Sequence, residues 1–119
     1  MDSILTSIKK DLGIMEDYTH FDADIIMGIN TAFSILTQLG VGPSTGFSIS
    51  DKNSVWTDFV ADTSRLEFIK TYVSKKTKMI FDPPTSSAVM ESMNRILSEL
   101  EWRINVAVDP SNVSGDVND

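Results

Sequence analysis

The residues best placed for chemistry form one acidic cluster around a single histidine. The stretch reads EDYTHFDAD, and His20 lies in it between Glu16 and Asp17 on one side and Asp22 and Asp24 on the other. Carboxylate oxygens suit Ca²⁺ or Mg²⁺, but the spacing matches no EF-hand loop, which also needs a turn glycine and a closing glutamate. We therefore interpret the cluster as a solvated, acidic approach to a helix N-terminus, where carboxylates favour the positive end of the dipole.

Patterns for other kinds of reactive or binding site are weak. The chain has no cysteine, which excludes a thiolate nucleophile, a disulfide framework and a Cys-ligated zinc site. We interpret no serine as the nucleophile of a Gly-x-Ser-x-Gly elbow. The glycine-rich stretch GVGPSTG lacks the Gly-Lys-Ser/Thr ending that places a lysine on phosphate. We expect no enzymatic activity, metal, cofactor or small-molecule substrate.

A lysine cluster, KKTK, contributes Lys75, Lys76 and Lys78. Three lysines at the end of a helix compensate the negative end of its dipole and keep that end solvated. Phosphate contact is the alternative, and the acidity of the whole chain counts against it. We keep the three lysines as candidate interface residues.

A tryptophan near the end of the chain is the second candidate for an interface. The stretch SELEWRINV places Trp102 near the edge of an apolar stripe, with Glu99 and Arg103 as a favourable pair four residues apart. Exposed aromatic residues beside arginine are common interface anchors. Burial in the core is the other reading of Trp102, and the sequence leaves both open.

Composition fits one globular domain. The chain has 119 residues, 41% of them hydrophobic, and its net charge is −7 with a pI near 4.5. Such an acidic surface repels phosphate backbones, so nucleic acid is not expected as a tightly bound partner, although DNA could pass nearby without sticking. The N-terminal stretch does not read as a secretory signal, and no apolar run approaches membrane-spanning length. We expect a soluble intracellular protein.

Hydrophobic spacing predicts helices through most of the chain. One is expected over residues 2–13, capped by Asp2 or Ser3, and a longer one begins with Asp22 as its N-cap. A short helix anchored by Trp56 and Phe59 follows a long loop at 40–54. The next helix should start at a capping box formed by Ser64 and Glu67. We also expect a close helix contact at Gly28, because glycine in a helix interior costs stability.

A proline corner separates the last two long helices. It is formed by Asp82, Pro83, Pro84 and Thr85. Proline disfavours helical geometry in the preceding residue and removes a backbone donor, so the first helix must stop there. The next helix can be capped by Thr85 or Ser86, or can begin at Asp82 with both prolines in its first turn. Its apolar stripe comprises Val89, Met93, Ile96 and Leu100, flanked by Met90, Leu97 and Ile104.

These elements predict an all-α fold, a small bundle of about four to five helices with a Pro-Pro corner and one long flexible loop. Residues 1–108 form its single helical domain. Residues 109–119 are small, polar and acidic, and we expect a flexible C-terminal tail.

The chain resembles a known family through the stretch VWTDFVAD and the later run MIFDPPTSSAVMESMNRILSELEWRINV. Together they are similar to the small helical head–tail connector, or adaptor, proteins of tailed bacteriophages and prophages. The similarity covers about residues 50–106, and FDPPTSS followed by a helix ending in ELEWR is its most specific part. These motifs contain no catalytic signature.

The resemblance implies a structural virion protein. Its subunits would assemble into a ring below the portal, extend the channel through which DNA passes without specific binding, and dock tail or stopper proteins. It would occupy the head–tail junction of the virion and the host cytoplasm before assembly. A different class of function fits the same composition: a small acidic helical regulator, of phage or bacterial origin, that binds a partner protein. A regulator should stay monomeric or dimeric, whereas a connector should carry head-to-tail surfaces.

Overall fold

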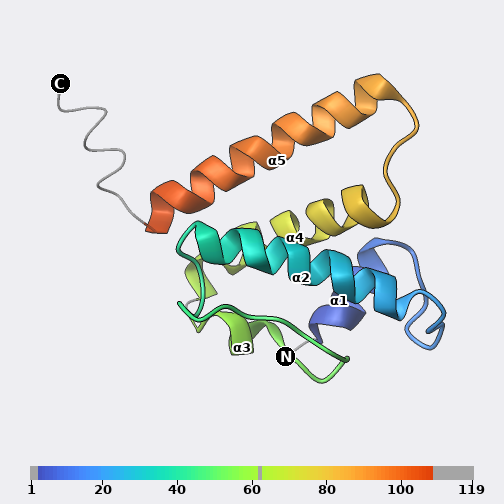
Figure 1. Ribbon diagram of the computed structural model, residues 1–119, viewed down its shortest axis with the longest axis horizontal. Helices are drawn as coiled ribbons and strands as arrows, with labels where there is room; N and C mark the ends of the chain where they lie inside the picture. The colour runs from blue at the N-terminus through green and yellow to red at the C-terminus, as the bar shows by residue number, and fades with distance from the viewer. Residues whose placement is uncertain (1–2, 62, 109–119) are drawn as a thin grey trace.

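The structure is a computed structural model that describes residues 3–61 and 63–108. These residues contain five α-helices and one short 3-10 turn, joined by loops (Figure 1). In chain order they are α1 (Ile4–Asp11), α2 (Asp22–Gln38), α3 (Trp56–Phe59), η1 (Thr63–Arg65), α4 (Leu66–Phe81) and α5 (Ser87–Val108). The prediction of a small all-α bundle is confirmed. The predicted tail at 109–119 lies outside the described residues.

The ends of α1 follow the sequence signals. Ser3 is its N-cap, and the Ser3 hydroxyl accepts a hydrogen bond from the backbone N–H of Thr6 at 3.2 Å. After the helix, Gly13 has a φ of +79°, a left-handed conformation that glycine adopts without a steric penalty. Both features were predicted for this segment.

Two other predicted helix starts are wrong. Asp22 is the first residue of α2 rather than its cap; Phe21 holds the cap position without a side-chain hydrogen bond. The predicted capping box at Ser64 and Glu67 does not start α4, because residues 63–65 form a 3-10 turn. That turn moves the start of α4 to Leu66, with Arg65 at the cap position and no side-chain capping bond there.

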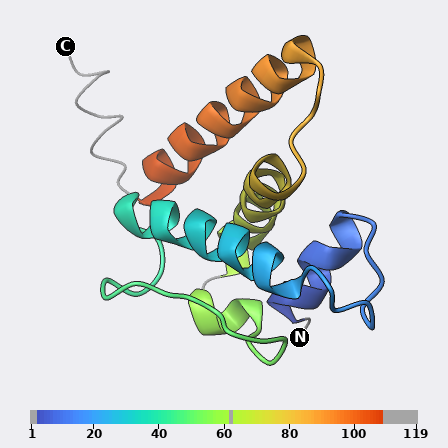
Figure 2. The same cartoon turned by 45° about the vertical axis from the view of Figure 1, so that its right-hand side comes forward.

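Helix α2 is the centre of the bundle and packs most extensively on α4 (Figure 2). Its inner face is fully buried and comprises Ile25, Ile29, Ala32, Phe33 and Leu36. Where the two helices meet, a methyl group added at Gly28 would lie 3.1 Å from Thr77 Cγ2. Side-chain atoms would be crowded at that distance, so the glycine lets the two backbones approach. The predicted close helix contact at Gly28 is confirmed.

The long loop between α2 and α3 is tied to the helices at two places. The Asn30 side chain accepts a hydrogen bond from the Ile49 N–H at 2.8 Å and donates one to the Ile49 carbonyl at 3.0 Å. The Ile4 N–H donates to the Ser54 carbonyl at 2.9 Å. Helix α3 follows, and its Trp56 and Phe59 are buried as predicted.

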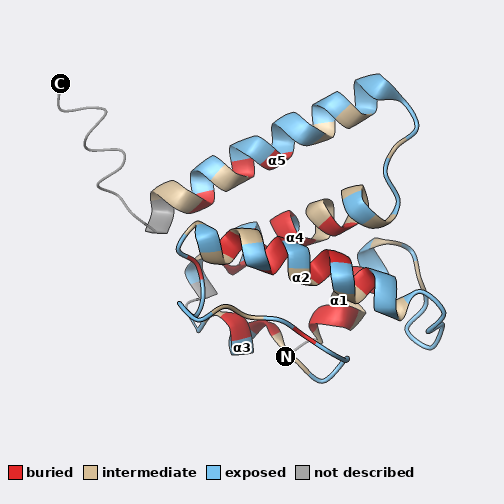
Figure 3. Ribbon diagram, in the orientation of Figure 1, coloured by how far each residue is buried: buried red, intermediate tan, exposed pale blue. Residues whose placement is uncertain are grey.

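Helix α5 packs on the rest of the bundle through only part of its length. Leu97, Leu100 and Ile104 are buried, whereas Val89 is 49% and Ile96 42% exposed. In both views the C-terminal end of α5 lies near α2, and the N-terminal end of α5 lies away from the other helices (Figures 1 and 2). Colouring by burial shows the same change along the helix (Figure 3). The predicted apolar stripe is therefore real, but the bundle buries it fully only in its second half.

Candidate functional site

The proline corner is an extended linker between two helices. Asp82 ends α4, where its N–H donates to the Lys78 carbonyl and its carboxylate pairs with the Lys78 ammonium, both at 2.8 Å. Pro83, Pro84 and Thr85 belong to neither helix. Of the starts left open for the next helix, the structure selects Ser86, whose side-chain oxygen accepts a hydrogen bond from the Val89 N–H at 3.4 Å. The corner thus stops α4 completely before α5 begins.

Trp102 is an exposed residue rather than a core residue, with 60% of its surface accessible. It lies two residues after the buried Leu100, which places the two side chains about 160° apart around the helix axis. The expectation that Trp102 borders the apolar stripe is wrong, because it lies on the opposite face of α5. Its neighbour Arg103 pairs with Glu99 at 3.2 Å, and both of these side chains are more than half exposed.

The three candidate lysines are distant from Trp102. Lys75, Lys76 and Lys78 are half-buried and fall in the second half of α4, which ends at the opposite end of the bundle from the C-terminal end of α5 (Figure 1). The structure therefore does not bring the six candidate interface residues together. It divides them between the two ends of the molecule.

The acidic cluster around His20 does not form a metal site. Among the described residues, no group of three or more histidine and carboxylate side chains is placed to hold a metal ion. The His20 ring instead packs edge-on against the Phe21 ring, with centroids 4.8 Å apart. Asp22 has another role, which the sequence did not reveal.

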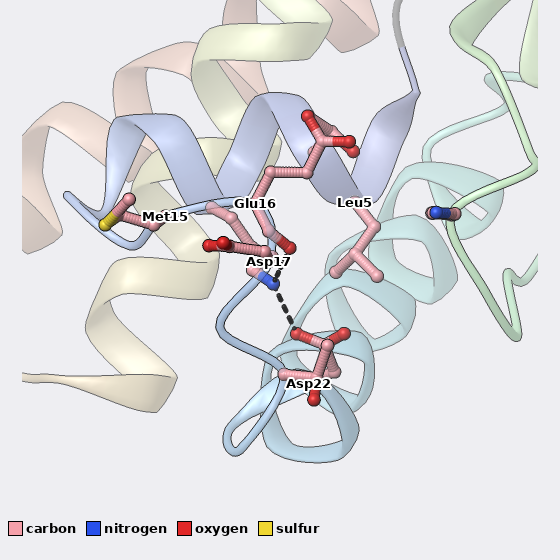
Figure 4. Close-up of a pocket in the computed structure, with 9 residues that line it drawn as sticks. Leu5, Met15, Glu16, Asp17 and Asp22 are labelled. Atoms are coloured by element: carbon pink, nitrogen blue, oxygen red, sulfur yellow. Dashed lines mark hydrogen bonds and ion pairs between the residues drawn. The ribbon is translucent and has the colours of Figure 1, made fainter.

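That role is to pair with a buried lysine. Lys9 is only 2% exposed, and its ammonium lies 2.8 Å from Asp22 Oδ1. The same nitrogen donates to the carbonyls of Glu16 at 2.9 Å and Tyr18 at 2.7 Å. Figure 4 shows the contacts to Asp22 and Glu16 at the wall of a hollow beside the α1–α2 loop, which Leu5, Met15 and Asp17 also line. The ammonium thus pairs with one carboxylate and donates to two backbone carbonyls, so Lys9 fixes the loop against the start of α2.

A serine motif that sequence reading missed lies in the long loop. Residues 42–46, GPSTG, do match the Gly-x-Ser-x-Gly pattern. However, Ser44 is exposed in a turn closed by the Gly46 N–H and the Pro43 carbonyl at 2.9 Å. A nucleophile elbow needs a strand before the serine and a helix after it, and this loop offers neither. The match carries no catalytic function.

A buried hydrogen bond fastens α5 to α4. The Tyr72 hydroxyl donates to Glu101 Oε2 at 2.7 Å, and the tyrosine is fully buried. Burial raises the pKa of Tyr72 far above its ordinary value, and the hydrogen bond to Glu101 and its negative charge raise the pKa further. Nearby, the Asn105 side chain donates to the Leu39 carbonyl at 3.3 Å. Both bonds lie in the C-terminal half of α5, so that half is anchored.

Exposed apolar side chains gather at the end of the bundle where α2 begins and α4 ends. An open groove there, which we call the end groove, is lined by Phe21, Asp24, Met27, Ile80, Phe81 and Asp82. Met27 is 65% and Ile80 43% exposed, and the Phe21 and Phe81 rings meet edge-on at 5.4 Å. Exposed apolar patches with a polar rim mark interaction surfaces. The end groove and the uncovered half of α5 are the two such surfaces that we consider below.

Comparison with known proteins identifies one similarity. A family model described as phage connector protein matches residues 4–111. No curated protein and no solved structure matches the chain. None of the helices within the described residues combines the length and apolar character needed to cross a membrane.

Proposed function

Because the chain belongs to the phage connector protein family, we propose that it is a subunit of a ring that lies below the portal and joins the phage head to the tail. Membership of this family gives a structural connector role in the virion. The ring, its place below the portal and its docking of tail or stopper proteins are the content of the proposal.

The observation that carries the proposal is the uncovered half of α5. Val89 and Ile96 continue the same apolar stripe as the buried Leu97 and Leu100, yet nearly half of each side chain stays exposed. A helix of a monomeric protein buries such a stripe on its own core. Apolar surface left open on a rigid helix instead suits a subunit whose neighbours complete its packing.

Charge supports the same role. A net charge of −7 makes the subunit repel a DNA backbone at a distance of about a Debye length, roughly 8 Å at physiological salt. A channel wall of this sign lets DNA pass without gripping it. The phosphate-binding role considered for Lys78 is weakened, because its ammonium is paired with Asp82 at 2.8 Å.

The test is assembly with the portal protein of the same phage. Purified subunit is mixed with purified portal rings, separated by size exclusion, and imaged in negative stain beside portal alone. We expect an added ring of density on one end of the portal, with a fixed number of subunits per portal by native mass spectrometry. A subunit that neither binds portal nor forms rings at high concentration, and that captures a single partner protein in a 1:1 complex, would establish the regulator instead.

A further inference from the structure

The two ends of the molecule carry surfaces that match each other. We propose that the outer face of α5 in one copy docks into the end groove of a second copy, with Trp102 as the anchor. This inference rests on the proposed function and supplies a specific contact for it. The outer face of α5 is defined here by Arg95, Ser98 and Trp102.

The donor surface is an exposed aromatic side chain beside a cation. Trp102 is 60% exposed, and Arg95 and Ser98 are exposed on the same helix. Seven residues separate Arg95 from Trp102, so at about 100° and 1.5 Å per residue they lie about 20° apart around the axis and about 10 Å apart along it. Arg95 takes part in none of the ion pairs identified among the described residues. Tryptophan and arginine are the residue types enriched at interface hot spots.

The acceptor surface is apolar with acidic groups. Four of the six residues that line the end groove are large and apolar, and the other two are Asp24 and Asp82. The groove is open to solvent and has a volume of about 560 Å³, so its size does not exclude an indole ring. Asp82 already pairs with Lys78, whereas Asp24 takes part in none of the identified ion pairs of the described chain. Asp24 is thus the carboxylate available to Arg95.

The positions of the two surfaces decide which occupant fits. The end groove lies where α2 begins and α4 ends, whereas Trp102 belongs to the C-terminal part of α5, which ends at the other end of the bundle (Figure 1). One copy therefore cannot fill its own groove with its own Trp102. Contact between two copies would be heterologous, which makes a closed ring or an open filament rather than a twofold dimer. The local match of Arg95 on one copy with Asp24 in the groove of another points to a second copy as the occupant.

Trapping by disulfide tests the contact even if it is weak, because the native chain has no cysteine. Two single variants are made, Met27→Cys in the end groove and Ser98→Cys beside Trp102. Equal amounts are mixed under mild oxidation, and the linked peptides are identified by mass spectrometry. We expect heterodimers, in which one variant is linked to the other, to exceed the homodimers of either variant by roughly tenfold. Heterodimers no more abundant than the homodimers would overturn the proposal.

Anchor variants separate this docking from random collision. Trp102→Ala added to Ser98→Cys should lower the heterodimer yield by roughly tenfold, as loss of an interface hot spot does. Phe68→Ala added to the same variant is the matched control, because Phe68 is 47% exposed on α4 and belongs to neither surface. Equal yields with Trp102→Ala and Phe68→Ala would also overturn the proposal. Asp24→Lys in the Met27→Cys partner should reduce the yield, and Arg95→Glu added to Ser98→Cys should restore it.

Portal binding separates failure of this contact from failure of the proposed function. If the cross-linking result is negative while the wild-type chain still adds a ring to the portal, the ring is held by other surfaces and only this inference fails. If cross-linking is positive while no ring forms on the portal, copies dock as proposed and the connector placement fails.

Discussion

Helices α2 and α5 have similar apolar stripes but different surroundings. On α2, every residue of the inner face from Ile25 to Leu36 is fully buried. On α5, the stripe is buried at Leu97 and Ile104 and open at Val89 and Ile96. Periodicity determines which face of a helix is apolar, and it does not determine whether the same chain covers that face. In this protein, α2 holds the fold together, whereas the first half of α5 keeps part of its apolar stripe exposed.

A pair of identical substitutions tests this contrast most strongly. Ile29→Ala on α2 removes a fully buried side chain and should lower the free energy of unfolding by about 2–5 kcal/mol, since it creates a cavity. Ile96→Ala on α5 removes one that is 42% exposed and should cost less than about 1 kcal/mol. Urea denaturation followed by circular dichroism measures both. Similar losses for the two variants would mean that α5 is covered in solution, and the contrast would fail.

The polar contact at the start of α2 should give the next largest effect. Lys9→Met leaves Asp22 and two backbone carbonyls without the ammonium that they contact. Removing one partner of a buried pair costs about 3 kcal/mol when the other is partly solvated, and Asp22 is 25% exposed. Lys10→Met is the matched control, because Lys10 is exposed. Thermal denaturation compares the two. Equal melting temperatures would show that the loop does not depend on Lys9.

The anchored half of α5 is tested by Tyr72→Phe. Loss of the 2.7 Å hydrogen bond to Glu101 should cost about 1–2 kcal/mol at neutral pH. The pKa of Tyr72 is raised in the folded state above the ordinary value of 10.0, so the folded protein holds this proton more tightly than the unfolded chain. The contribution of Tyr72 to the free energy of unfolding should therefore be constant below pH 10 and fall as pH rises above it.

The phenylalanine variant lacks this titration, so its stability should fall less over the same alkaline range. Urea denaturation of both proteins at pH 7, 9, 10 and 11 gives the comparison. Parallel curves for the two proteins above pH 10 would show that Tyr72 does not carry the alkaline dependence.

An effect on stability of about the same size as that of Tyr72→Phe is expected at the corner. Pro83→Ala with Pro84→Ala increases the freedom of the unfolded chain, which costs about 0.4–1 kcal/mol for each proline. Helicity should be retained, because Ser86 still caps α5. Assembly should be impaired first, since the corner sets the angle at which α5 leaves α4. Circular dichroism beside the portal-binding assay checks this, and unchanged assembly would show that the prolines do not orient α5.

Much of the fold could be predicted because its signals are local. The helices, the cap at Ser3, the left-handed Gly13 and the anchors Trp56 and Phe59 each follow from residue types within a few positions. The start of α4 could not, because residues 63–65 form a 3-10 turn that places the start of the helix at Leu66. The capping-box pattern at Ser64 and Glu67 therefore did not determine where the helix begins.

The site was less predictable because it depends on contacts distant in sequence. Two acceptors of Lys9 are backbone carbonyls, which cannot be predicted from residue types. Tyr72 donates to Glu101, which lies 29 positions away in the sequence. The position of Trp102 was accessible, since its angle from Leu100 follows from helical geometry alone. The end groove was not, because Phe21 and Phe81 meet only through tertiary packing.

Because α5 is buried only in its second half, its first half projects from the bundle. Its contacts with the bundle are held by Leu97, Leu100 and Ile104 near one end, and the extended corner at 82–86 restrains the other. About ten residues, or about 15 Å of helix, project from Leu97 to Ser87 at 1.5 Å per residue. A tilt of about 20° at the anchored end would move the tip by about 5 Å. Such a tilt would move the exposed apolar side chains of α5 while the core stays unchanged.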